Sequence, residues 1–248
     1  MSPLPLVCLH GWGLNRQVFD GLRARWAGTV LALDLPGHGG CAMEGCVAHT
    51  LDAWVDVLLP QLPSRCVLLG WSLGGQLALR LAQREPARVE RLVLVATTPR
   101  FVAGADWLLG MAPAALQRFA DGLARDWQAT LAEFLLLQVR GSRDAAEALA
   151  QLQQTVAAQG GADPQALAAG LQILRDSDLR SAATTVTLPT LVLSGQHDRV
   201  THPDAGAWLA NALPRARYVQ IARAGHAPFI SHQDDFYAHL ADFLAEAA

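Results

Sequence analysis

The chain of 248 residues is 52% hydrophobic and 17% charged, and this composition indicates one large folded domain rather than disorder. Its 19 basic residues are all arginines and are outnumbered by 22 acidic residues, so no basic face for nucleic acid is expected. No apolar run reaches the roughly 18 residues of a membrane span, and residues 1–6 lack the pattern of an export signal. We therefore expect a cytoplasmic monomer with no membrane partner.

Six short runs of consecutive apolar residues are typical of strands buried on both faces of a parallel sheet. Helical patterns separate them, and this alternation indicates a mostly parallel sheet covered by helices. The expected strands are 4–9, 30–33, 66–69, 92–95, 190–193 and 218–221, and the expected helices are 16–26, 51–59, 73–84, 204–212 and 234–247.

The alternation is interrupted over residues 99–185, where only helical patterns occur. Asp163 is expected to cap a helix that begins with Pro164. An insertion that follows a strand lies at the carboxyl edge of the sheet, where it would cover a site and carry its specificity. The sequence thus predicts a core of residues 1–98 and 186–248 and a helical lid of residues 99–185, with helices at 113–125, 127–139, 142–158 and 164–175.

Cysteines at four positions do not have the spacing of a metal site. Cys8 and Cys66 fall in expected core strands, while Cys41 and Cys46 lie between elements. Paired C-x-x-C spacing and a suitable histidine pattern are both missing. Reduced thiols, no metal and no other cofactor are therefore expected.

The pentapeptide Gly70-Trp71-Ser72-Leu73-Gly74 lies between an apolar strand and a helical pattern. This G-x-S-x-G spacing in this context is typical of a nucleophile elbow, in which a strained turn exposes the serine hydroxyl. Small residues also occur at strand-to-helix turns for packing reasons alone. The pattern makes Ser72 a candidate nucleophile.

A serine nucleophile needs a histidine base, and the base needs a carboxylate that orients it. After such an elbow the acid and then the histidine follow later strands. Asp198 follows the strand at 190–193, and His226 follows the strand at 218–221. We interpret Asp34 as a structural residue of a glycine-rich turn, and Asp204 as part of the first turn of a helix.

The remaining histidines are assigned non-catalytic roles. His10 precedes a glycine turn and is expected to brace it, and His197 is adjacent to Asp198 but projects differently. Five further histidines are expected to be solvated: His38, His49, His202, His232 and His239.

Acyl transfer also needs donors for the developing oxyanion, and backbone amides are the usual source. The loop after the first strand predicts one amide at Trp12, and the residue after the nucleophile gives the other at Leu73. The Trp12 side chain either lines the acyl pocket or plugs the loop, and the sequence favours neither reading.

Four segments carry a resemblance to known proteins: LHGWGLN at 9–15, LGWSLGG at 69–75, GLQIL at 170–174 and HAPFISH at 226–232. Over its whole length the chain resembles the α/β-hydrolase superfamily. That resemblance implies one or two antiparallel strands before the first expected strand, and because only a few residues precede it here, the sheet is expected to be shortened at that edge. The four segments are similar to those of the pimeloyl-[acyl-carrier protein] methyl ester esterases of biotin synthesis. The resemblance implies a triad of Ser72, Asp198 and His226 and an acyl-enzyme route, and it implies substrate contacts at Trp12, Leu73, Phe134, Leu135, Leu136, Leu137 and Gln138.

The resemblance also implies a small ester carried on an acidic acyl-carrier protein, which contacts arginines along the lid. The aligned positions in this chain are not arginines, and other lid arginines are expected to form the basic patch instead. The leucines at 135–137 fit an apolar acyl tunnel and a helical core equally well. The aligned positions are Ala129, Glu133, Ala146 and Ala150, and the other arginines are Arg118, Arg125, Arg140 and Arg143.

Three alternative functions remain open on the sequence. One is a general short-chain carboxylesterase that uses the same residues without a carrier protein. Another is a carbon–carbon bond hydrolase or lyase that uses the triad for proton transfer. The third is a non-catalytic receptor that keeps the hydrolase fold.

Overall fold

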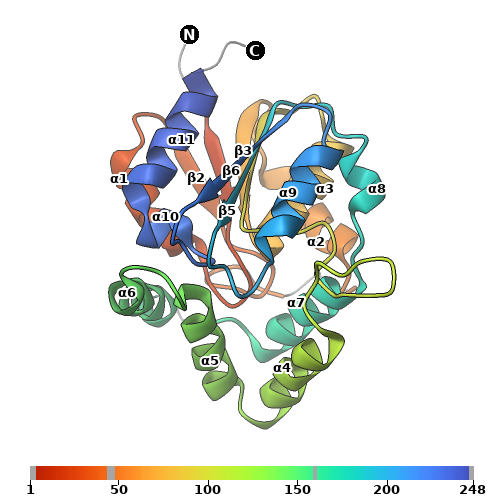
Figure 1. Cartoon of the computed structure of the whole chain (residues 1–248), viewed down its shortest axis with the longest axis vertical. Helices are drawn as coiled ribbons and strands as arrows, with labels where there is room; N and C mark the ends of the chain where they lie inside the picture. Colours follow the sequence, from red (N-terminus) through yellow and green to blue (C-terminus); the bar gives the residue numbers. More distant parts are fainter. Residues whose placement is uncertain (1–3, 44–47, 159–160, 246–248) are drawn as a thin grey trace.

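The computed structural model describes residues 4–43, 48–158 and 161–245. Six parallel strands form one sheet in the order β2-β1-β3-β4-β5-β6 (Figure 1). This confirms the expected parallel α/β-hydrolase architecture. Because every strand runs in the same direction, the segments that follow them meet at one edge. The strands are β1 (Leu6–Leu9), β2 (Val30–Leu33), β3 (Cys66–Trp71), β4 (Val89–Val95), β5 (Thr190–Gly195) and β6 (Ala216–Ile221).

Successive side chains of each strand enter two separate hydrophobic clusters, one on each face of the sheet. Leu68 and Leu92 belong to one cluster, whereas Leu69 and Val93 belong to the other. Helices cover both faces, so the strands are apolar at consecutive positions. Helices α1 (Asp20–Arg25) and α11 (Gln233–Ala245) cover one face, and α2 (Leu51–Leu58), α3 (Leu73–Arg84), α8 (Arg180–Ala183) and α9 (Pro203–Ala212) cover the other (Figure 1).

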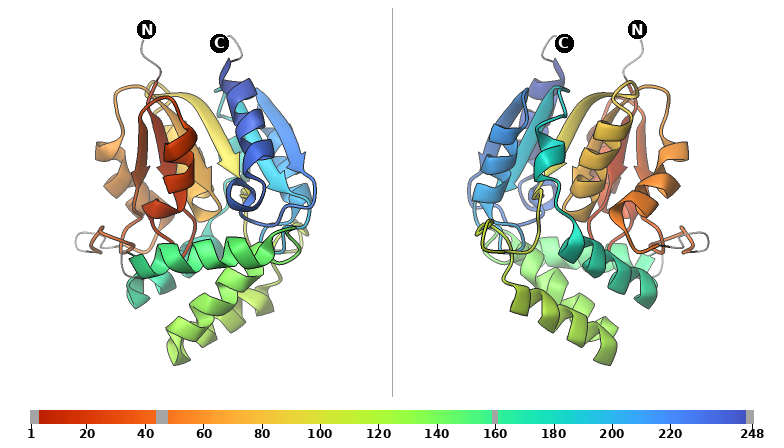
Figure 2. Two further views of the ribbon diagram at one scale, coloured as in Figure 1. Left: turned by 90° about the vertical axis from the view of Figure 1, so that its left-hand side faces the viewer. Right: turned by 90° about the vertical axis from the view of Figure 1, so that its right-hand side faces the viewer.

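Four helices between β4 and β5 lie beyond the carboxyl edge of the sheet, and we call them the lid helices (Figure 2). Helix α4 packs against both α5 and α7. Asp163 caps α7 by accepting from the amide of Gln165 at 2.7 Å, and Pro164 is the first helical residue, as expected. The lid helices are α4 (Pro113–Arg125), α5 (Trp127–Val139), α6 (Ala145–Ala158) and α7 (Pro164–Asp176).

Several expected boundaries differ from the observed ones. The first expected helix opens as a 3-10 turn, η1 (Arg16–Phe19), before α1. The expected helix 142–158 begins only at Ala145, because Gly141 turns the chain with a φ of 85°. Residues 100–111, which precede the first expected lid helix, form an irregular loop with isolated bridges.

Three further short helices in the described residues were not predicted. They are η2 (Leu59–Gln61), α8 (Arg180–Ala183) and α10 (Pro228–Ser231), and α10 directly follows the loop that carries His226. The expected end of the last helix, at residue 247, lies outside the described residues.

Cys8 and Cys66 are buried free thiols, as expected from their strands. Burial raises the pKa of the Cys8 thiol far above its ordinary value, and it raises the pKa of Cys66 to about 11. Cys41 is partly exposed, and Cys46 lies outside the described residues. Across residues 4–43, 48–158 and 161–245, no cluster of three metal-binding side chains occurs, and no helix combines the length and apolarity of a membrane span.

Candidate active site

Ser72 occupies a strained turn between β3 and α3. Its φ of 57° and ψ of −119° fall in a region that L-residues rarely adopt. A methyl group at Gly70 would lie 2.3 Å from the carbonyl oxygen of Gly74, and one at Gly74 would lie 2.3 Å from that of Leu9. The two glycines therefore permit the close approach of strand and helix that creates the turn.

The structure brings Ser72, His226 and Asp198 into one chain of hydrogen bonds. The distance from His226 Nε2 to Ser72 Oγ is 2.9 Å, and that from His226 Nδ1 to Asp198 Oδ2 is 2.8 Å. A carboxylate only accepts hydrogen bonds, so Nδ1 carries the proton and Nε2 is free to accept from the serine hydroxyl. The three side chains come from the carboxyl ends of β3, β6 and β5, in the geometry of a nucleophile, a base and an orienting acid.

Asp198 is buried, and four donors compensate its charge. Its Oδ1 accepts from the amides of Val200 and Thr201 at 2.8 and 3.0 Å. Its Oδ2 accepts from the Thr201 hydroxyl at 2.8 Å in addition to His226. These bonds offset the cost of burying a carboxylate and fix its direction. The sequence analysis missed Thr201, although a hydroxyl three residues after an aspartate is a recognisable turn signal.

The amides of Trp12 and Leu73 are available as donors beside Ser72. Neither amide makes a hydrogen bond to any other residue that the structure describes. A methyl group at Gly11 would lie only 3.3 Å from Ser72 Cβ, so the loop after β1 packs directly on the elbow. The first amide of a helix has no partner within the helix, and such amides commonly bind anions.

The Trp12 side chain is buried between the loop and the lid. Its Nε1 donates to the carbonyl of Leu167 on α7 at 2.8 Å, and its ring contacts Phe134 edge-on at 4.8 Å. With 1% of its surface exposed, the ring joins the loop after β1 to two lid helices.

His10 and His38 connect the loop after β1 to the loop after β2. The Nε2 of His10 accepts from the Leu35 amide at 3.0 Å, and that of His38 accepts from the Gly13 amide at 3.3 Å. His10 thus braces the turn, as expected. His38 was expected to be solvated, and this was wrong because His38 is fully buried. His232 is also buried rather than solvated.

Asp34 accepts from the amides of Arg16 and Gly40, at 2.7 and 3.1 Å, which fits its expected structural role in the glycine-rich turn.

Lid helix α5 turns the residues of 134–138 in different directions, because consecutive helical residues lie about 100° apart. Phe134 packs on Trp12, and Leu137 faces the cavity described below. Leu135 is buried with core residues, whereas Leu136 is 54% exposed and lines an outer groove instead. Gln138 is buried, and in the described part of the chain neither polar atom of its side chain has a hydrogen-bond partner.

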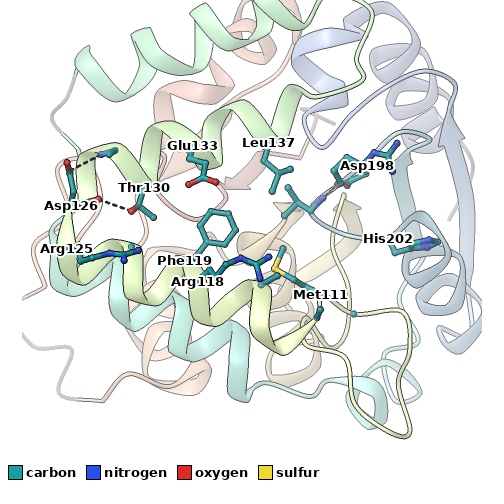
Figure 3. A pocket seen from close by; sticks show the side chains of 17 residues that line it. Met111, Arg118, Phe119, Arg125, Asp126, Thr130, Glu133, Leu137, Asp198 and His202 are labelled. Atoms are coloured by element: carbon teal, nitrogen blue, oxygen red, sulfur yellow. Dashed lines mark hydrogen bonds between the residues drawn. The ribbon is translucent and has the colours of Figure 1, made fainter.

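A cavity of about 760 Å³ extends from Asp198 between α4 and α5 (Figure 3). Phe119 and Leu137 give it an apolar wall, and Arg118 and Arg125 of α4 lie along its side (Figure 3). Of Ser72, Asp198 and His226, its lining includes Asp198, and its volume is in the range of small-molecule sites.

The arginines differ in whether they pair with acids. Arg80 and Arg84 of the core bind Asp52 and Asp56, and Arg175 of lid helix α7 binds Asp176. Five other arginines are exposed and make no hydrogen bond or ion pair with any described residue. The unpaired group comprises Arg118, Arg125, Arg140 and Arg143, together with Arg199 beside Asp198.

Comparisons with known proteins agree with this geometry. The family model described as "alpha/beta hydrolase fold" matches residues 5–233. The chain is 45% identical to a pimeloyl-[acyl-carrier protein] methyl ester esterase of Nitrosomonas europaea, over 93% of this chain and 92% of the relative. It is 43% identical to the protein of the same name from Aromatoleum aromaticum, over 95% and 96% of the two chains.

Among solved structures, the enol-lactonase from Burkholderia xenovorans LB400 aligns with a TM-score of 0.83 and 26% identity, over 99% of this chain and 93% of that one.

Proposed function

Because the chain belongs to the pimeloyl-[acyl-carrier protein] methyl ester esterases of the α/β-hydrolase family, we propose that it hydrolyses the methyl ester of pimeloyl-acyl-carrier protein in biotin synthesis. The observation that carries the proposal is the hydrogen-bonded chain from Asp198 through His226 to Ser72 at a strained elbow. This arrangement fits acyl transfer through a serine nucleophile.

Ser72 Oγ attacks the methyl ester carbonyl while His226 Nε2 takes its proton. The amides of Trp12 and Leu73 stabilise the negative oxygen of the tetrahedral intermediate, and each such donor contributes roughly 3 kcal/mol to lowering the barrier. His226 then returns the proton to the leaving methanol. Water, activated by the same imidazole, hydrolyses the pimeloyl-enzyme ester and restores Ser72.

The lid helices supply the acyl site. Phe134 and Leu137 of α5 provide apolar surface, and Leu135 supports them from the core. The buried amide of Gln138 is available to a polar group of the substrate, because no described residue pairs with it. An unpartnered buried amide is costly, which supports a role in binding. Leu136 faces solvent and contributes to the outer surface instead.

The carrier protein binds to the face that bears the unpaired lid arginines. Arg140 and Arg143 flank the turn between α5 and α6, and Arg118 and Arg125 lie along the cavity. Guanidinium groups without an internal partner are free to pair with the acids of a carrier protein, and local potential rather than net charge steers such a partner. This patch would replace the arginines that the family has at the positions of Ala129, Glu133, Ala146 and Ala150.

Rescue of a bacterial strain that lacks its own methyl ester esterase tests the proposed function. Expression of the wild type restores growth without biotin, and expression of Ser72→Ala does not, although both proteins accumulate to the same level. Failure of the soluble wild type to restore growth would favour a general short-chain carboxylesterase. The absence of arginine at Ala129, Glu133, Ala146 and Ala150 would then explain why the carrier protein is not bound.

Fluorophosphonate labelling of the same preparation separates this outcome from a non-catalytic receptor. An esterase is labelled at Ser72, whereas a receptor is neither labelled nor active on any ester.

A further inference from the structure

The loop that carries His226 is hydrogen-bonded to the lid through two consecutive amides. The amide of His226 donates to the carbonyl of Gln138 at 2.8 Å, and that of Gly225 donates to Ser142 Oγ at 2.9 Å. The ring of His197 makes a third bond to the lid, from Nδ1 to the carbonyl of Gly141 at 2.9 Å. We call these three acceptors, the carbonyls of Gln138 and Gly141 and the hydroxyl of Ser142, the latch.

The backbone of His226 is also held from its other side. The indole Nε1 of Trp71, within the elbow itself, donates to the carbonyl of His226 at 2.8 Å. The peptide groups before and after His226 Cα are therefore fixed by the lid and by the elbow, respectively. Since the imidazole is attached to this Cα, its distance to Ser72 Oγ depends on both attachments.

Small residues permit the close contact between latch and loop. A methyl group at Gly225 would lie 2.6 Å from Ser142 Oγ and 2.9 Å from the Gln138 carbonyl. Gly141 adopts a φ of 85°, which turns the chain after α5 so that the Ser142 hydroxyl reaches the Gly225 amide. The contact is thus built into the chain at both of its sides.

Packing fixes the position of the latch relative to the core. Leu135 and Val139, on the last turns of α5, are buried in the cluster that contains Trp71 and Phe229. The end of α5 is therefore attached to the core by apolar contacts as well as by hydrogen bonds. This end of the lid is the part that lies against the base.

We propose that the latch positions the catalytic base and that Ser142 is its positioning residue. The lid then has two functions, since it covers the substrate and also sets the geometry between His226 and Ser72. The inference rests on the proposed role of His226 as the general base.

Ser142→Ala removes one latch acceptor and leaves the buried Gly225 amide without a partner. Small displacements of a reacting group are costly, so we expect kcat on a p-nitrophenyl ester to fall by about tenfold while KM changes by less than about twofold. The rate of fluorophosphonate labelling at Ser72 is expected to fall by the same factor. Ser142→Thr keeps the hydroxyl and is expected to recover most of kcat.

Ser177→Ala is the matched control, because Ser177 follows lid helix α7 and its side chain makes no hydrogen bond among the described residues. Thermal unfolding of all three variants separates a loss of positioning from a loss of folded protein. The proposal is overturned if Ser142→Ala and Ser177→Ala have the same kcat and labelling rate, or if threonine at 142 is as slow as alanine. A wild type that is labelled at Ser72 but does not rescue growth without biotin would contradict the assigned substrate. The role of the latch could still be tested, because the p-nitrophenyl ester assay and the labelling do not depend on that substrate.

Discussion

Ser72 shows how a single residue stores strain for chemistry. Its positive φ presents the hydroxyl above the carboxyl edge of the sheet, and the carbonyl of Ser72 is held by the Thr97 hydroxyl at 2.7 Å. Surrounding contacts maintain a conformation that an L-residue would otherwise leave. The strain therefore has a measurable counterpart in stability.

Replacement of Ser72 by glycine or by alanine measures this strain. Both variants lose esterase activity, but Ser72→Gly is expected to unfold with a free energy about 1 kcal/mol higher than Ser72→Ala, because glycine adopts a positive φ without a Cβ clash. The same pair of substitutions at Ser177, where φ is −79°, provides the control and should favour alanine. If urea unfolding gave the same free energy of unfolding for Ser72→Gly and Ser72→Ala, the backbone at residue 72 would not be strained.

His38 makes stability depend on pH. Burial lowers the pKa of His38 to about 4, from an ordinary value of 6.5, and it lowers the pKa of His10 as well. The unfolded chain binds these protons at a higher pH than the folded chain does. The contribution of the two neutral histidines to stability is therefore fully present above pH 6.5 and is lost as the pH falls toward 4. His38 alone accounts for roughly 3 kcal/mol of this loss.

Urea unfolding between pH 7.5 and pH 4.5 measures the effect. His38→Gln, which has no proton to take up, is expected to show a smaller loss of stability over this range than the wild type. His49→Gln changes an exposed histidine and should behave as the wild type does. If the free energy of unfolding fell by the same amount with pH in the wild type and in His38→Gln, His38 would not contribute to the pH dependence of stability.

Sequence reasoning brought Ser72, Asp198 and His226 together correctly because each follows a strand, and parallel strands end at one edge. It did not find the burial of His38, which depends on a contact with the distant Trp54 ring, 5.8 Å away. It also placed Ser142 at the start of a helix, whereas the hydroxyl is needed by the Gly225 amide. Contacts between segments far apart in sequence leave no local pattern.

At the scale of elements, lid helix α7 packs against the loop after β1 and holds its Trp12 side chain. Gly170 on this helix faces the Trp12 indole, and a methyl group there would lie 2.6 Å from Trp12 Cδ1. The preceding turn of α7 supplies the Leu167 carbonyl that accepts from the same indole. The helix and the loop are therefore fitted to each other around one side chain.

Gly170→Ala tests this fit. Alanine in a helix usually stabilises relative to glycine, by about 1 kcal/mol, but here the added methyl displaces Trp12. We expect a lower melting temperature and a lower kcat on a small ester, because the Trp12 amide moves with its side chain. Ala168→Leu, on the exposed side of α7, is the control. A Gly170→Ala variant that is stabilised and fully active would contradict the close packing of Gly170 on the Trp12 indole.

Most helices were predictable because their apolar positions repeat with a helical period and their caps are explicit, as at Asp163. The run at 134–138 shows the limit of such reasoning. The five consecutive residues were predicted to contact the substrate together, but the helix places their side chains in the cavity, in the core and in solvent. Only the packing of α5 between α4 and α6 decides which of these leucines faces the cavity.

At the scale of the whole molecule, charge is divided between the two edges of the sheet. Core arginines such as Arg80 and Arg84 pair with acids, whereas Arg118, Arg125, Arg140 and Arg143 of the lid have no partner among the described residues. We propose that these four guanidinium groups form the local basic face that attracts the acidic carrier protein, although the net charge of the chain is −3.

Charge reversal at Arg140 and Arg143 separates docking from chemistry. The double variant to glutamate is expected to lower kcat/KM for a carrier-bound ester by at least tenfold, and the effect should weaken in high salt. Turnover of a small ester should change far less. Arg215→Glu, at the amino end of β6, is the control for surface charge; equal effects on the two esters would contradict the docking face.

The proposed function requires that Ser72 attacks the methyl ester of a carrier-bound pimeloyl group and releases methanol. Purified wild type and Ser72→Ala are incubated with the methyl ester of pimeloyl-acyl-carrier protein, and methanol and the mass of the carrier protein are measured. The wild type is expected to release one methanol for each free carboxyl formed, with the acyl group still on its carrier, and Ser72→Ala is expected to release none. Release by both proteins, or by neither when both are folded, would contradict the account.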